Sequence, residues 1–143
     1  MENCPICEKH KEKVALFYED EHWIVRPGPF NSHLLGYVYI EPKRHVENWS
    51  DFTEIELKKI GWLIKKCETA LRQLLNVERV YTVTISEAVR HIHFHVIPRE
   101  LENDIKGLQL IKQVTQQTDI YTNKISDSFE YESFNRKIKQ YFI

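Results

Sequence analysis

Glycine and proline are scarce in this 143-residue chain, which has four of the first and five of the second. Collagen-like and low-complexity chains are rich in these residues, and disordered chains are poor in apolar ones, whereas 42% of this sequence is hydrophobic. No internal repeat, Gly/Ser linker or long charge run divides the chain. Its length lies within the usual ~100–200 residues of one domain, which predicts a single domain over residues 1–143.

An excess of charge of one sign is also missing, because 20 basic residues oppose 21 acidic ones. No overall field would draw the protein to nucleic acid or to an anionic membrane, so we expect neither partner. The longest apolar stretch, Leu34 to Ile40, is far shorter than the ~20 residues of a membrane-spanning helix. The first residues carry no signal-peptide pattern, and we expect a cytoplasmic protein.

Cysteine is rare too, and an odd count of three cannot form a complete disulfide framework. We expect Cys67 to be a buried small hydrophobe, because it falls on the apolar face of a predicted helix. Cys4 and Cys7 form a Cys-x-x-Cys pair ahead of any predicted strand or helix, and so lack the helix that lowers the pKa of a redox thiol. Half of a zinc site is the favoured interpretation, and two unliganded surface thiols are the alternative. Zinc needs two further ligands, for which His10 and His22 are candidates.

The predicted secondary structure separates strands from helices. Runs of β-branched and aromatic residues predict strands at 14–18, 22–27, 35–40, 79–85 and 91–97, of which the last two form a hairpin. Apolar residues near 101–111 and 131–141 predict helical segments around an irregular stretch, the apolar positions being Leu101, Ile105, Leu108, Ile111, Tyr131, Phe134, Ile138 and Tyr141. This segregation favours an antiparallel α+β fold.

The clearest helix signal begins after Ser50. Apolar residues recur there at alternating spacings of three and four, at Leu57, Ile60, Ile64, Cys67, Leu71 and Leu74. A capping box would start this helix, formed either by Asp51 with Glu54 or by Thr53 with Glu56.

The chemistry is concentrated in the sequence His91-Ile-His-Phe-His-Val-Ile-Pro-Arg99. Residues two apart in a strand share a face and lie ~6–7 Å apart, so we expect His91, His93 and His95 on one side of the strand. The opposite side would carry the core residues Ile92, Phe94 and Val96. A solvent-exposed histidine-rich strand or an incidental metal-binding tract is the alternative, but the strict alternation favours a reactive site.

This segment resembles the signature of the histidine triad (HIT) superfamily, His-x-His-x-His followed by two apolar residues. The stretch from Ile40 through His45 to Asn48, with the helix that follows, is similar to that family's strand, turn and first helix. The resemblance spans roughly residues 4–99. It implies a HIT-like antiparallel sheet of about five strands with flanking helices, commonly a homodimer, that acts on nucleotides at the α-phosphate.

The resemblance makes the middle histidine, His93, the nucleophile. An imidazole with a reference pKa of ~6.5 is mostly neutral at pH 7, so it attacks phosphorus without prior deprotonation and forms a labile phosphoramidate. We expect a backbone carbonyl to hold the other ring nitrogen of His93. We also expect His95 to donate a hydrogen bond to the phosphate oxygens.

The zinc-bearing branches of the superfamily, and the related galactose-1-phosphate uridylyltransferases, combine a Cys-x-x-Cys pair with two histidines. One histidine lies in the turn after the strand, and the other is the first of the triad. The resemblance therefore implies a structural zinc ion on Cys4, Cys7, His45 and His91. It also implies that the chain belongs to a zinc-bearing branch that resembles the dinucleoside polyphosphate hydrolases.

The sequence departs from the family in two places. Many of those hydrolases carry a glycine-rich loop with Ala-Gly-Gln-x-Val before the triad, whereas residues 84–90 here contain no glycine. The Gly-His pair that usually follows the family's second strand is replaced here by Gly36-Tyr37. We expect Ser86 and Arg90 to contact phosphate, with a solvated side chain as the alternative for Arg90.

Contacts to the nucleoside are predicted less directly. Asn31, or its neighbour Ser32, is a candidate for binding the ribose. Trp23 and Phe30 could sandwich a base, although aromatic residues on strands more often belong to the core.

The sequence thus predicts a nucleotide hydrolase or nucleotidyl transferase that acts on a dinucleoside polyphosphate or a related nucleotide through a nucleotidyl-histidine intermediate. One alternative passes the nucleotidyl group to a sugar phosphate or to inorganic phosphate. Another is a non-catalytic nucleotide-sensing or partner-binding module, which the missing glycine loop would favour. A homodimer seam is expected along the first long helix and residues 79–85.

Overall fold

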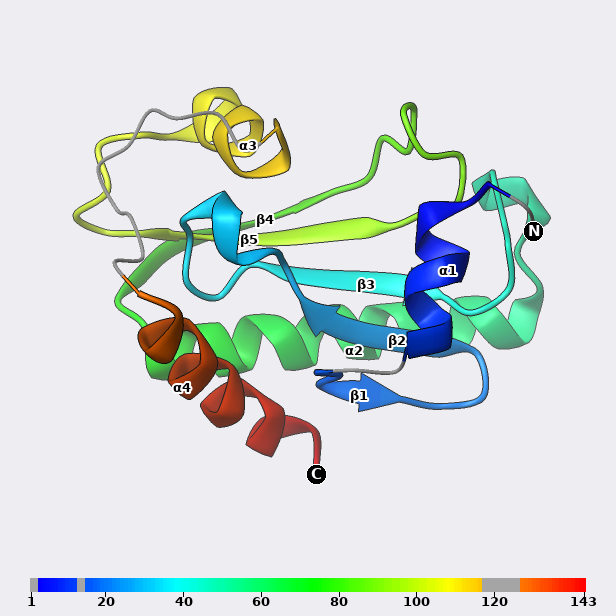
Figure 1. The fold of residues 1–143 in the computed structure, drawn as a ribbon, viewed down its shortest axis with the longest axis horizontal. Coiled ribbons are helices and arrows are strands. Elements are labelled where there is room, and N and C mark those ends of the chain that lie inside the picture. The colour runs from blue at the N-terminus through cyan, green and yellow to red at the C-terminus, as the bar shows by residue number, and fades with distance from the viewer. Residues whose placement is uncertain (1–2, 13–14, 117–126) are drawn as a thin grey trace.

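The computed structural model describes residues 3–12, 15–116 and 127–143. In this part of the chain, five strands form an antiparallel sheet in the order β1-β2-β3-β5-β4. The strands are β1 (Tyr18–Glu19), β2 (Trp23–Pro27), β3 (Val38–Pro42), β4 (Val77–Val83) and β5 (Phe94–Glu100). The helices around the sheet are α1 (Pro5–Glu12), α2 (Glu54–Leu74), α3 (Gly107–Gln116) and α4 (Ser128–Lys139). This arrangement, shown in Figure 1, confirms the predicted α+β fold class.

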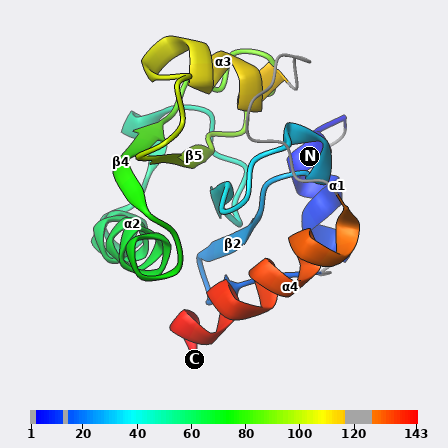
Figure 2. The same cartoon turned by 90° about the vertical axis from the view of Figure 1, so that its left-hand side faces the viewer.

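Helices cover both faces of the sheet, as the end-on view of Figure 2 shows. The main core lies between one face and helices α2 and α4, and it includes Leu63 and Leu71 from α2 and Ile138 from α4. A second cluster lies on the other face, where Leu110 and Val114 of α3 pack against Ile97. On this second face α3 lies toward one end of the sheet and α1 toward the other (Figure 1).

Helix α2 begins with the second of the two predicted capping boxes, in which Thr53 and Glu56 each accept the other's backbone N–H. Its buried stripe is Glu56, Ile60, Leu63, Cys67, Ala70 and Leu71. The predicted stripe was wrong at Leu57, which is 40% exposed, because the cap and an ion pair with Arg44 at 2.8 Å turn Glu56 inward instead. None of the described helices combines the length and apolar character that a bilayer crossing requires.

Cys67 is buried in the main core, as predicted. Burial raises the pKa of its thiol to about 12, so it stays protonated and behaves as a small apolar side chain.

The strand predicted at 91–97 begins only at Phe94, so the expectation of three histidines on one strand face was wrong. Its pairing with β4 starts at His95, opposite Val83. The residues before it bond outside the β4 ladder, with the Ile92 N–H donating to the Val46 carbonyl at 2.7 Å. The expected core side chains, Ile92, Phe94 and Val96, are all buried in the main core.

Other boundaries also moved. Of the strand predicted at 14–18, only Tyr18 lies in a strand, and Val14 falls outside the described residues. In α3 the predicted face was wrong at Leu108, which is 83% exposed, because Leu110 and Val114 meet the sheet. The buried positions Phe134 and Ile138 of α4 are confirmed. Most of the expected irregular stretch between these helices lies outside the described residues.

Candidate active site and metal centre

The four predicted zinc ligands come together from three separate parts of the chain. The donor atoms of Cys4, Cys7, His45 and His91 all lie within 4.8 Å of one another. Cys4 immediately precedes α1 and Cys7 lies in its first turn, where the Cys7 N–H donates to the Cys4 Sγ at 3.3 Å. The expectation that no helix accompanies the cysteine pair was therefore wrong. The helix holds both sulfur atoms on one side of the chain, beside the histidines.

Three of the sulfur-to-nitrogen separations in this cluster match those around a tetrahedral zinc ion. Zinc bonds of about 2.3 Å to sulfur and about 2.0–2.1 Å to nitrogen place the two donors about 3.5 Å apart. The observed separations are 3.5 Å from Cys7 Sγ to His45 Nδ1, 3.4 Å from Cys7 Sγ to His91 Nδ1 and 3.6 Å from Cys4 Sγ to His91 Nδ1. Two thiolates and two imidazoles form a closed set of protein donors, as in structural zinc sites.

A second contact orients the His91 ring for this role. Its Nε2–H donates to the Pro42 carbonyl at 2.8 Å, which leaves Nδ1 facing the cluster. Burial lowers the pKa of His91 to about 4, so the ring is neutral, as a ligand must be. The competing candidates are not part of the cluster. The His10 ring lies beside that of His91, with centres 5.6 Å apart, but its Nε2 contacts Glu41 at 2.9 Å, and His22 lies 4.0 Å from Glu21.

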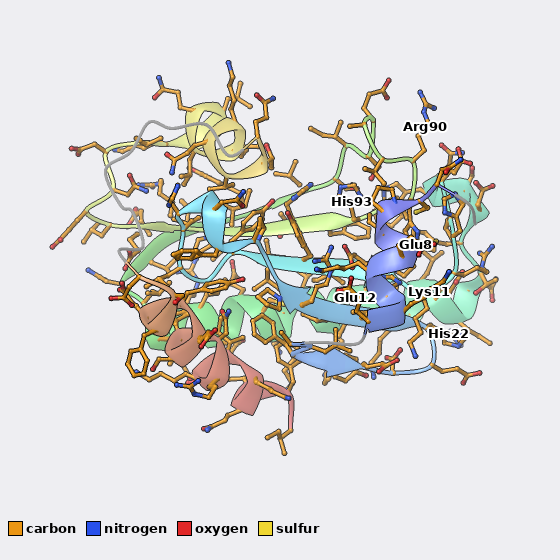
Figure 3. The ribbon with its side chains drawn as sticks, viewed as in Figure 1. Glu8, Lys11, Glu12, His22, Arg90 and His93 are labelled. Carbon is orange, nitrogen blue, oxygen red and sulfur yellow. The ribbon has the colours of Figure 1, made fainter. Side chains whose placement is uncertain are left out.

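His93 is held through its Nδ1 and leaves its other ring nitrogen available. Nδ1 lies 2.7 Å from the His91 carbonyl oxygen, the backbone acceptor that the chemistry of a nucleophilic imidazole led us to expect. The Ser86 hydroxyl lies 3.3 Å from the same nitrogen and accepts the His93 N–H at 3.1 Å. His93 is half-buried and is the last residue of the loop that joins β4 to β5 (Figure 3). This geometry leaves the lone pair at Nε2, where an electrophile can be reached.

His95 lies beside His93, with ring centres 4.9 Å apart. It is 9% exposed, and its Nδ1 lies 2.6 Å from the Tyr37 hydroxyl. Burial, together with the neighbouring His93, lowers the pKa of His95 to about 4, so the ring is neutral at pH 7. A neutral imidazole keeps one N–H and can act as a hydrogen-bond donor without carrying charge.

The three predicted substrate-binding residues occupy different surroundings. Ser86 contacts His93, as described above. Arg90 is exposed at the edge of the molecule and pairs with Glu87 at 3.4 Å (Figure 3). Asn31 is exposed in the short 3-10 turn Phe30–Ser32, and the predicted alternative Ser32 is buried.

Neither aromatic candidate for base stacking lies open on the surface. Trp23 is fully buried, and its indole N–H donates to the Glu56 carbonyl at 3.0 Å. Phe30 packs against Tyr131 with ring centres 5.5 Å apart. For Trp23, the core interpretation is the correct one.

Residues 9–102 match the profile of the HIT domain. The chain belongs to the HIT family. It is 28% identical to galactose-1-phosphate uridylyltransferase of Thermotoga maritima over 85% of this chain, but it spans only 41% of that enzyme's length. It is 28% identical to the protein hit of Bacillus subtilis, covering 72% of this chain and 75% of the relative. An uncharacterized HIT-like protein of Methanocaldococcus jannaschii is 30% identical over 60% of this chain and 69% of its own.

Solved structures share the fold at lower identity. A hypothetical histidine triad nucleotide-binding protein from Sulfolobus tokodaii has a TM-score of 0.70 at 19% identity, covering 96% of this chain and 91% of its own. A zinc-bound histidine triad family protein from Mycobacterium smegmatis has a TM-score of 0.68, also at 19% identity, covering 97% and 92%.

Sequence reasoning missed a buried charged cluster on the face of this HIT sheet that also carries His95. Glu41 is 1% exposed and accepts two hydrogen bonds from Arg26, each at 2.8 Å. Burial alone would raise the pKa of Glu41, but the hydrogen bonds from His10 and Arg26 outweigh it and lower the pKa to about 2. Arg26 in turn lies 4.7 Å from the ring centre of Tyr39. The sequence signal for this cluster was Arg26, a charged residue inside the strand predicted at 22–27.

We expect Glu41→Gln to lower the free energy of unfolding by about 3–5 kcal/mol, because it leaves the half-buried Arg26 without its counter-charge. Urea denaturation at pH 7 measures the change. Glu78→Gln, which makes the same substitution at an exposed position of β4, is the matched control and should change stability by less than about 0.5 kcal/mol. Equal midpoints for the two variants would contradict the role given to this ion pair.

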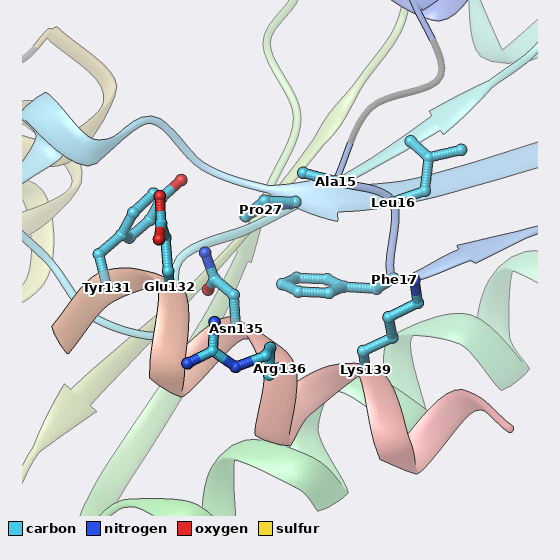
Figure 4. Close-up of a pocket in the computed structure, with 9 residues that line it drawn as sticks. All are labelled: Ala15, Leu16, Phe17, Pro27, Tyr131, Glu132, Asn135, Arg136 and Lys139. Atoms are coloured by element: carbon cyan, nitrogen blue, oxygen red, sulfur yellow. The ribbon is translucent and has the colours of Figure 1, made fainter. Parts of the chain in front are cut away.

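A separate cavity of about 360 Å³ lies between α4, residues 15–17 before β1, and Pro27 at the end of β2 (Figure 4). None of the triad or metal-site residues lines it. The Tyr131 hydroxyl at its rim donates to the Gly28 carbonyl and so ties α4 to the loop after β2. The lining residues are Ala15, Leu16, Phe17, Pro27, Tyr131, Glu132, Asn135, Arg136 and Lys139.

Proposed function

We propose that this HIT protein is a nucleotide hydrolase or nucleotidyl transferase that acts at the α-phosphate through a covalent intermediate on His93. The observation that carries the proposal is the His93 ring, bonded at Nδ1 to the His91 carbonyl and free at Nε2, with His95 beside it. Two similar proteins support it: one relative is named a galactose-1-phosphate uridylyltransferase, and one structural neighbour is named a hypothetical histidine triad nucleotide-binding protein.

In the first step, the Nε2 lone pair of His93 attacks the α-phosphorus, and an N–P bond forms. The bond from phosphorus to the leaving-group oxygen breaks, and that oxygen departs with the electron pair. The Nδ1 proton stays on the ring and bonds to the His91 carbonyl, which stabilises the positive charge of the modified imidazole. The neutral His95 donates a hydrogen bond to the phosphate oxygens, where negative charge is spread.

In the second step, water attacks the same phosphorus and the N–P bond breaks, which returns the electron pair to Nε2. The proton lost by water passes to the solvent, and a nucleoside monophosphate is released. A sugar phosphate or inorganic phosphate in place of water gives nucleotidyl transfer by the same route. The similarity to a uridylyltransferase favours nucleotidyl transfer to such an acceptor as the alternative to hydrolysis.

We further propose that the metal is zinc and that its role is structural. The four protein donors would complete a tetrahedron and leave no position for an activated water. The zinc-bound relative from Mycobacterium smegmatis supports the choice of metal. Bound zinc would tie α1 to the loops that carry His45 and His91. We also propose a cytoplasmic location, where the thiolate ligands Cys4 and Cys7 would stay reduced.

A substrate screen tests the proposed activity. Purified protein is incubated with dinucleoside polyphosphates, nucleoside phosphoramidates and nucleotide sugars, with and without inorganic phosphate or a sugar phosphate, and the products are separated by chromatography. Release of nucleoside monophosphate supports a hydrolase, and product formation that depends on the added acceptor supports a transferase. Binding of nucleotide with no turnover of any substrate would contradict both and support a sensing module.

We also expect a homodimer. Strand β4 is an edge strand of the described sheet, and α2 separately exposes Ile55, which is 61% exposed, and Trp62, which is 41% exposed and lies against Tyr18 of β1. An open strand edge and exposed apolar side chains each favour symmetric pairing. Light scattering at micromolar concentration should give about twice the 17.2 kDa chain mass, and a monomer would contradict the expectation.

A further inference from the structure

The Tyr37 hydroxyl forms a hydrogen bond with Nδ1 of His95. The two atoms lie 2.6 Å apart, and Tyr37 is only 2% exposed. Tyr37 immediately precedes β3, and the second residue of that strand, Tyr39, pairs with His95 of β5. The two side chains thus meet because adjacent strands place them on the same face.

Both rings are held in place by their packing. The rings of Tyr37 and His95 meet end to end through this hydrogen bond, with centres 5.9 Å apart and an interplanar angle of 24°. The Tyr37 ring also lies against Gly28, where any Cβ atom would collide with it. Tyr39 packs edge-on against the His95 ring, with ring centres 5.5 Å apart. The imidazole therefore has little freedom to turn and exchange one nitrogen for the other.

The chemistry of the two groups determines the direction of the hydrogen bond. Burial raises the pKa of Tyr37, so it keeps its proton, and burial lowers the pKa of His95, so it carries a single N–H. A phenol is a stronger acid than a neutral imidazole N–H, and an imidazole nitrogen is a better acceptor than a phenol oxygen. The favoured arrangement has the phenol donating and the Nδ1 atom accepting.

We propose that Tyr37 is a positioning residue that fixes His95 in the tautomer with its proton on Nε2. That N–H lies on the side of the ring away from Tyr37 and is the donor that phosphate bound at His93 would meet. The inference rests on the proposed function for its consequence in catalysis. The tautomer itself is a property of the free protein, and this separates the two tests.

The first test is ¹⁵N NMR of protein labelled at histidine, since protonated and unprotonated ring nitrogens have well-separated shifts. The His95 signals are assigned by their loss in His95→Gln. In the wild-type protein at pH 7 we expect a bare Nδ1 and a protonated Nε2, and in Tyr37→Phe a mixture of both tautomers. A wild-type Nδ1–H tautomer would overturn the inference even if Tyr37→Phe failed to fold.

The second test is kinetic. Tyr37→Phe should lower kcat by up to roughly 10²-fold with a smaller change in KM, because the Nε2–H is needed most in the transition state. In the His95→Ala background, Tyr37→Phe should cause no further loss, since its effect passes through His95. Additive losses would show a purely structural role and overturn the proposal.

The matched control is Tyr81→Phe. Tyr81 packs in the same cluster, and its hydroxyl accepts the Gly107 N–H at 2.8 Å rather than contacting the triad. It should keep the wild-type tautomer of His95 and nearly the wild-type kcat. If the protein turns over no nucleotide, the proposed function fails, while the NMR experiment still decides the role of Tyr37.

Discussion

Replacing His93 with alanine is expected to reduce turnover by at least ~10⁴-fold, because the substitution removes the atom that forms the covalent bond to phosphorus. The ring is half-buried and lies outside the metal cluster, so folding, metal content and nucleotide binding should change little. Steady-state rates on the best substrate from the screen measure the loss. Circular dichroism and elemental analysis check that the variant remains folded and loaded with metal.

His95→Ala is the matched comparison, since it removes the neighbouring imidazole but leaves the nucleophile. Its expected loss is on the order of 10²–10³-fold, as for the removal of one hydrogen-bond donor to a developing oxyanion. Quenching a wild-type reaction that contains labelled nucleotide should trap an acid-labile, base-stable adduct on the peptide that includes His93. Near wild-type turnover in His93→Ala would refute the mechanism, and so would an adduct mapped to another peptide.

Loss of the metal is expected to have the largest effect on stability. Metal binding free energy is also folding free energy, since the ligands come from segments far apart in the sequence. Even a loss of ~3 kcal/mol would lower the Tm by about 10 °C for a domain of this size. We therefore expect Cys7→Ser, or treatment with a chelator, to lower the Tm by at least that amount. Differential scanning calorimetry measures the shift, and elemental analysis should find about one zinc per chain in the wild-type protein only.

Cys67→Ala provides the control for this experiment, because it removes a thiol that lies in the main core and outside the cluster. It should keep its metal and lose only the stability that follows from a small cavity, on the order of 1 kcal/mol. A Cys7→Ser variant with unchanged metal content would contradict the ligand assignment. Wild-type protein that carries no metal would contradict it as well.

Periodicity and composition were sufficient to predict the α+β fold class, because strand and helix patterns differ in period and stand in separate parts of this chain. They were also sufficient to single out the three alternating histidines. The four metal ligands were predicted from the resemblance together with residue type, since thiolates and imidazoles in such a combination suit zinc. These properties are local, or are carried by short motifs.

The positions of side chains across elements depended on the tertiary structure. Residue spacing placed Leu57 on the buried face of α2, but Arg44, from a segment before the helix, pairs with Glu56 and draws that residue inward. The histidines were predicted on one strand face, yet His91 turns to the metal cluster and His93 to the His91 carbonyl before the strand begins.

The buried cluster around Glu41 and the contact between Tyr37 and His95 also depended on the tertiary structure. Each joins residues that are distant in the sequence, so it exists only once the register of the sheet is set. The sequence by itself determined the type of fold and the chemical groups available for reaction. Only the tertiary structure decided which nitrogen of each histidine is held and which is free, because hydrogen-bond partners for a ring come from neighbouring segments rather than from its own.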